Sequence, residues 1–133
     1  WINPNTQNTA EEVKKLTDGN GADVVITATS APSVHTEAQE IAAKMARISL
    51  FGGLPGESKG YLDSNLIHYK ELQVCGVHAT TAGFMREIMK LMEEGKLNAK
   101  KYIERFTDMD HILDAFAAIR DENVMKVVIH PQG

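Results

Sequence analysis

The sequence has little of what builds a disulfide, a cysteine-based metal site or a membrane span. Cys75 is the only cysteine among the 133 residues, so the chain can form no internal disulfide and offers no cysteine cluster to zinc. No apolar run approaches the ~20 residues that a membrane-spanning helix needs. Acidic and basic residues are interspersed and give a formal net charge of −4, whereas a nucleic-acid-binding domain would present a basic face. We therefore expect neither a membrane nor a nucleic acid as a partner.

Patterns of export and of catalysis are also missing. The chain begins Trp1-Ile2-Asn3-Pro4 without a signal-peptide pattern, which together with the lone thiol predicts a cytoplasmic location. The histidines have no spacing suited to a metal, and no serine lies in the Gly-x-Ser-x-Gly pattern of a nucleophile elbow. The sequence thus points to no catalytic residue and to no metal ligand of its own.

What the sequence does contain is an alternation of short apolar runs and amphipathic segments. Hydrophobic residues make up 43% of the chain and charged residues 24%, which is the mix of a globular protein. The runs Asp23–Thr27 and Ile48–Phe51 show no polar alternation, which is typical of strands buried on both faces of a parallel sheet. A third strand is expected at Leu72–Val77. Strands that alternate with helices form βαβ units, so the predicted fold class is α/β, with a parallel sheet covered by helices.

Four helices are expected around these strands, and Gly95 is predicted to end the third of them. The stretch Glu57–Lys70 is polar and mixed and is predicted to be a long connection. Near the C-terminus, an alternating strand at Tyr102–Phe106 and a final strand at Lys126–His130 flank the last helix. The predicted caps and core-facing residues of the helices are Thr9 with Val13 and Leu16; Ser33 with Val34, Ala38, Ile41, Ala42 and Met45; Thr80 or Thr81 with Phe84, Ile88, Leu91 and Met92; and Asp108 with Ile112, Ala115, Phe116 and Ile119.

Small and polar residues lie at the end of each predicted parallel strand. Ligands of open parallel sheets bind beyond the carboxyl ends of the strands, where small side chains let a ligand approach the backbone. A turn is the better explanation of each segment alone, whereas the three together, converging on one edge, indicate a crevice. No phosphate-binding glycine loop is present, because Gly52–Gly56 follows a strand without opening an amphipathic helix. The candidate residues are Ala28, Thr29 and Ser30; Gly52, Gly53 and Leu54; and Val77, His78 and Ala79.

Several segments carry a resemblance to a known family. Gly21–Ile26, Arg47–Gly53, Ile67–Leu72 with Gly76-Val77, and the ending Phe106–Pro131 resemble the medium-chain, zinc-dependent alcohol dehydrogenases. Within that family the texture is most similar to the polyol (sorbitol-like) and threonine dehydrogenases. The resemblance covers essentially the whole chain and implies the C-terminal part of such an enzyme.

The resemblance implies a partial Rossmann-like, doubly wound fold whose first strands and glycine-rich loop lie upstream. Residues 1–97 would form the C-terminal part of the NAD(P)-binding domain, and residues 98–133 would return to the catalytic domain. Zinc and the catalytic residues are expected only in the missing N-terminal part, so the isolated chain would be inactive and would bind dinucleotide weakly. The intact enzyme would transfer hydride between a secondary alcohol or polyol and NAD or NADP.

The resemblance also implies contacts with the cofactor. Ala28–Ser30 would lie near the adenosine and the nicotinamide ribose, Gly52–Leu54 would meet the carboxamide largely through backbone groups, and Val77–Ala79 would complete the contact. Lys126 stands where the family often places a basic residue near the pyrophosphate.

Two other interpretations fit the same residues. One is a self-contained, Rossmann-like binding or assembly module, and the other is part of a zinc-free medium-chain reductase that differs only upstream. Without the upstream strands the sheet would have an open edge, and such an edge pairs readily with another chain. A homo-oligomer is therefore expected.

Overall fold

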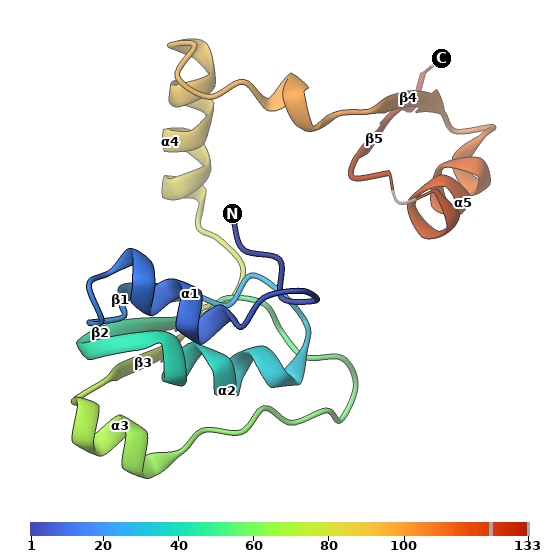
Figure 1. Cartoon of the computed structure of the whole chain (residues 1–133). Coiled ribbons are helices and arrows are strands. Elements are labelled where there is room, and N and C mark those ends of the chain that lie inside the picture. The colour runs from blue at the N-terminus through green and yellow to red at the C-terminus, as the bar shows by residue number, and fades with distance from the viewer. Residues whose placement is uncertain (123, 133) are drawn as a thin grey trace. The chain divides into compact units, whose positions relative to one another are not determined.

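The chain folds into two compact units, Trp1–Ala79 and Thr80–Gly133, in the computed structural model, which describes residues 1–122 and 124–132. None of the helices within those residues combines the length and the apolar character needed to cross a bilayer. Figure 1 shows the elements of both units. Those of unit one are α1 (Thr9–Leu16), β1 (Ala22–Ile26), α2 (Pro32–Ile41), β2 (Ala42–Leu50), α3 (Ser64–Lys70) and β3 (Gln73–Gly76). Those of unit two are α4 (Ala82–Glu93), the 3-10 helix η1 (Ala99–Tyr102), β4 (Arg105–Asp108), α5 (Ile112–Asp121) and β5 (Val127–His130).

Unit one is built on a three-stranded parallel sheet in the order β1-β2-β3. Val25 of β1 pairs with Ile48 of β2, and Ile48 pairs with Val74 of β3. Parallel neighbours cannot be joined by a tight hairpin, and here α2 connects β1 to β2 while α3 lies between β2 and β3 (Figure 1). The predicted α/β class with a parallel sheet is therefore confirmed.

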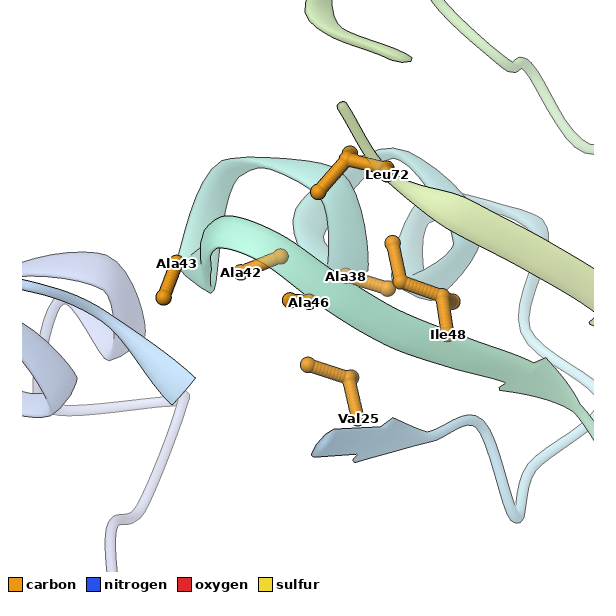
Figure 2. Packing of buried hydrophobic residues seen from close by; sticks show 7 residues of the cluster. All are labelled: Val25, Ala38, Ala42, Ala43, Ala46, Ile48 and Leu72. Carbon is orange, nitrogen blue, oxygen red and sulfur yellow. The ribbon is translucent and has the colours of Figure 1, made fainter. Parts of the chain in front are cut away.

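The core of unit one lies between this sheet and α2. Ile48 is fully buried, and Val25 and Ala38 belong to the same cluster (Figure 2). The other face of β1 is open, because Val24 is 49% exposed and Ile26 is 60% exposed. The prediction that this strand is buried on both faces is wrong. Side chains alternate across a strand, and α2 packs against the face that carries Val25.

The first helix differs from its prediction in its cap and in its buried side. Asn8 caps α1 instead of Thr9, and its side-chain oxygen accepts a hydrogen bond from Glu11 N at 3.1 Å. Leu16, predicted to face the core, is 76% exposed. This two-turn helix packs against α2 and buries none of its residues.

The second helix is shorter than its apolar spacing predicts. Pro32 opens α2 after Ala31, which is extended, as suits proline at a first helical position. Ser33 therefore lies inside the helix and is not its cap. Ala42 and Met45, predicted as helical core residues, belong to β2, because the chain becomes extended directly after the helix and pairs with β1.

Met45 holds a backbone conformation that suits glycine, since its φ is 62° and the residue is 72% exposed. The left-handed conformation costs a residue with a Cβ roughly 1–2 kcal/mol in the folded state. Glycine avoids this cost, but its unfolded chain has more conformational freedom, which offsets part of the gain in stability. We expect Met45→Gly to raise the free energy of unfolding by ~0.5–1 kcal/mol in urea denaturation. Met45→Ala keeps the Cβ and is the matched control. An equal gain in both variants would contradict the strain argument.

A helix that the sequence did not predict interrupts the connection between β2 and β3. Helix α3 lies within the stretch predicted to be one long connection. Asp63 caps it, and its carboxylate accepts hydrogen bonds from Asn65 N at 2.8 Å and Leu66 N at 3.2 Å. The helix has seven residues, which is too short to show the apolar repeat at i, i+4 and i+7 by which a helix is predicted.

Unit two contains a two-stranded parallel sheet, β4-β5, and the helices α4 and α5. The predicted cap of α4 is confirmed at Thr81, whose hydroxyl accepts from Phe84 N at 3.3 Å. Gly95, with a φ of 69°, follows the helix as predicted. The prediction that α4 has a buried apolar stripe is wrong. Periodicity shows that the apolar residues share one face of the helix, but it does not show that another surface covers that face. All four residues of the stripe are exposed: Phe84, Ile88, Leu91 and Met92.

The C-terminal elements have different bounds from those predicted. Strand β4 begins at Arg105, because the residues up to Tyr102 form η1. Helix α5 begins after His111, and Asp108, the predicted cap, instead accepts the backbone N–H of His111 at 3.0 Å. Of the predicted core residues of α5, Ala115 is buried, Ile112 is half-buried, and Phe116 and Ile119 are exposed.

Candidate functional site

The carboxyl ends of the three strands of unit one meet at one edge of the sheet. The strands run parallel and in register, with Ile26 opposite Ser49 and Leu50 opposite Gly76. The chain therefore leaves all three strands on the same side, which is the geometry of a ligand crevice in an open parallel sheet. The predicted residues form three strand-end segments at this edge, Ala28–Ser30, Gly52–Leu54 and Val77–Ala79.

Backbone hydrogen bonds extend from the strands into these segments. Thr27 N donates to Ser49 O at 3.0 Å, and Gly52 N donates to Thr27 O at 2.7 Å. On the other side of β2, Val77 N donates to Leu50 O at 3.3 Å. Thr27 is only 1% exposed, so these bonds lie partly out of water. The first residues after each strand are thus held in place by the sheet.

The two adjacent glycines of the second segment serve different purposes. A Cβ on Gly52 would lie 2.3 Å from Thr29 O, whereas a Cβ on Gly53 would have nothing within 4 Å. Gly52 is therefore required for the close approach of the first two segments. Gly53 leaves open space beside them, where a ligand can reach the backbone.

The strand-end segments offer hydrogen-bonding side chains and no carboxylate. Thr29, Ser30 and His78 are exposed, and the Thr29 hydroxyl also accepts from Ala31 N at 3.4 Å. Ala79 has a φ of 56° and turns the chain after the third segment. Such a surface can bind a polar ligand through hydroxyl, imidazole and backbone groups. It contains no pair of acid and base side chains for proton transfer.

Lys126, the remaining predicted contact, belongs to unit two. It precedes β5, it is exposed, and its backbone oxygen accepts from Glu104 N at 3.0 Å. The structure thus brings the three strand-end segments together within unit one, and the contact of Lys126 with a cofactor stays a prediction.

The described part of the chain does not fit a zinc ion. No three His, Cys, Asp or Glu side chains within it lie close enough together to hold a metal. Cys75 is an exposed free thiol in β3. A zinc ion needs three or four such ligands in a tetrahedral arrangement.

Two polar side chains outside the strand-end segments were missed by the sequence analysis. Gln39 of α2 is fully buried, and Lys70 lies at the end of the unpredicted α3. The one signal for Gln39 in the sequence was its place directly after Ala38, which belongs to the predicted apolar stripe of that helix. Apart from the His35 oxygen, four residues before Gln39, their partners are 22 to 31 residues away in the sequence, which no local pattern reveals.

Comparisons with known proteins agree with this architecture. Residues 1–94 match the family model for zinc-binding dehydrogenases. L-threonine 3-dehydrogenase of Pyrococcus furiosus is 33% identical in an alignment of length 132 that covers 96% of this chain and 37% of that protein. The (R,R)-butanediol dehydrogenase of Neisseria gonorrhoeae is 29% identical, over 98% of this chain and 37% of its own length. A solved structure from Sinorhizobium meliloti 1021, described as a zinc-binding dehydrogenase bound to NADP, has a TM-score of 0.87 at 20% identity and covers 98% of this chain and 38% of its own.

The parallel sheet and its ligand-type edge define a partial Rossmann-like α/β fold, as predicted. Because the family model covers more than half of the residues, the chain belongs to the zinc-binding dehydrogenase family. The resemblance to medium-chain, zinc-dependent alcohol dehydrogenases is thereby confirmed. The chain spans about 37% of the length of the curated relatives it matches.

The glycine pair allows a matched test of the edge. We expect Gly52→Ala to push the first two strand-end segments apart and to lower the free energy of unfolding by about 1–3 kcal/mol, the usual cost of overpacking. Gly53→Ala should change it by less than about 0.5 kcal/mol, because its Cβ meets no atom. Urea denaturation measures both, and amide spectra should shift around Thr29 in the first variant alone. Equal effects would refute the close contact.

Proposed function

We propose that this chain supplies one side of the dinucleotide pocket in a zinc-dependent, NAD(P)-linked dehydrogenase of secondary alcohols or polyols. The carrying observation is the convergence of three small, polar strand-end segments on one parallel-sheet edge, in a chain of the zinc-binding dehydrogenase family. Relatives named for threonine and butanediol act on compounds that contain a secondary alcohol, which supports the substrate class. The NADP bound to a solved relative supports the cofactor.

In this proposal the residues of the chain bind and orient the cofactor. The hydroxyls of Thr29 and Ser30, beside Ala28, meet ribose hydroxyls. The open backbone at Gly53 meets the carboxamide, and Val77–Ala79 complete the pocket. When bound, the nicotinamide ring gives or takes the hydride. Lys126 is proposed to contact the pyrophosphate, and the support for this contact is the resemblance to the family.

The domain assignment is part of the same proposal. Residues 1–97 belong to the dinucleotide-binding domain and residues 98–133 to the catalytic domain, with support for the first from the family match over residues 1–94. Zinc binds outside this chain, because the described residues do not fit it. The chain by itself is therefore inactive.

A homo-oligomer in the cytoplasm completes the proposal. β1 and β3 are the outer strands of the sheet in the described residues, and an open strand edge pairs readily with another chain. The lone exposed thiol of Cys75 suits a reducing compartment, where thiols persist unpaired.

Sequencing the encoding message upstream of Trp1 tests the assignment to an enzyme. An open frame with a glycine-rich loop and cysteine or histidine zinc ligands is expected. A start codon at the boundary would favour a self-contained binding module instead. An open frame without zinc ligands would favour a zinc-free reductase.

The pocket is tested on the chain itself by titration with nicotinamide mononucleotide. We expect shifts of the amide resonances of the strand-end segments, with a dissociation constant of ~1 mM or weaker, because the helix N-terminus that grips phosphate lies upstream in this proposal. Ribose 5-phosphate, which lacks the nicotinamide ring, is the control. Micromolar affinity for NADH by fluorescence, or shifts confined to α1 or unit two, would contradict the proposed pocket.

A further inference from the structure

We propose that Gln39 is a positioning residue for the strand-end segment Gly52–Leu54, an inference that rests on the proposed cofactor-binding role of that segment. The segment opens the β2–α3 connection, residues 51–63. Gln39 lies outside this connection, on α2. It binds the end of the connection that precedes α3, and the segment Gly52–Leu54 lies at the other end. Its exposure is 0%, which is unusual for a polar side chain.

The Gln39 amide fastens the β2–α3 connection to α2. Its Nε2 donates to Tyr61 O at 3.0 Å and to His35 O at 2.9 Å, and its Oε1 accepts from Asp63 N at 2.7 Å. A buried amide costs free energy unless it is hydrogen-bonded, and here the nitrogen and the oxygen both have partners. Because Asp63 is also the cap of α3, the bond fixes the start of that helix.

Two further contacts hold the same stretch against α2. Gly60 lies so close to the buried ring of His35 that a Cβ on it would be 2.3 Å from the ring Nδ1. Thr36 Oγ1 donates to Tyr61 O at 3.4 Å. The end of the connection is therefore held by three neighbouring positions of one helix face.

Lys70 fixes the other end of α3 to the same helix. Its Nζ donates to the backbone oxygens of Gln39 at 2.9 Å, Glu40 at 3.0 Å and Ala42 at 2.9 Å, and carbonyls at a helix C-terminus have no partner within the helix. Partial burial lowers the pKa of Lys70, and the charge of Lys14 lowers it further. Helix α3 is thus bound to α2 at both ends and gives the connection a fixed base.

The β2–α3 connection is consequently held at its two ends. Gly52 N donates to Thr27 O at its start, and Gln39 binds its finish. A loop with fixed ends has fewer conformations than one with a free end. Gln39 supplies two of the three side-chain hydrogen bonds that join Tyr61 and Asp63 to α2. Its loss therefore weakens this end and gives more freedom to the exposed residues next to Gly52, which are the ones proposed to meet the cofactor.

Amide hydrogen exchange of the 133-residue chain tests this coupling. In Gln39→Leu, the protection of the Gly52 amide should fall roughly tenfold, the scale of losing buried hydrogen bonds, while the amides of Val25 and Ile48 keep theirs. Ile48→Val, a core change on the same sheet, is the control and should lower protection throughout unit one in parallel. A parallel loss in Gln39→Leu, or no change at Gly52, would overturn the positioning role.

A second variant keeps the test valid if Gln39→Leu does not fold. Gly60→Ala pushes the connection off His35 without touching Gln39, and Gly76→Ala, whose Cβ would meet no atom within 4 Å, is its matched control. Gly60→Ala should reproduce the selective loss at Gly52, and an unchanged Gly52 amide in it would overturn the proposal. The exchange experiment contains no ligand, so a failure of nicotinamide mononucleotide to bind the wild type counts against the proposed function alone.

Discussion

The parallel backbone ladder of β1, β2 and β3 is the constraint on which the candidate site depends. β2 pairs on both sides, so the carboxyl ends of all three strands lie at one edge. Ile48 is fully buried in the cluster that it shares with Ala38 of α2, and its burial fixes which face of β2 is turned toward that helix. A slip of one residue would turn Ile48 to the open face and would separate Gly52 from Thr27, whose backbones are hydrogen-bonded. The shared strand-end edge and the core are thus two consequences of one register.

Local sequence patterns predicted the strands, their common edge, the Thr81 cap and the stop at Gly95. These features depend on a few consecutive residues, and the structure contains them. The capping pattern placed the start of α1 at Thr9, one residue after the observed cap Asn8, because adjacent polar residues can both cap and the backbone decides which one does. They missed Gln39 altogether, since its partners in the β2–α3 connection are 22 and 24 residues away.

Burial was the least predictable property of this chain. Periodicity shows which side chains share a face, and it identified the stripe of α4. Whether such a face is covered depends on a second surface that the pattern does not contain. Phe84 is 61% exposed and Ile26 is 60% exposed for this reason. The strand-end segments were easier to predict, because a ligand edge requires small residues at strand ends and no covering surface.

The register of the sheet is measured most directly by scalar couplings across its hydrogen bonds in solution. The account predicts couplings from the amide nitrogen of Thr27 to the carbonyl carbon of Ser49, from that of Gly52 to Thr27, and from that of Val77 to Leu50. Couplings that pair these amides with other carbonyls, or none at all in a folded sample, would contradict the shared edge and with it the proposed pocket.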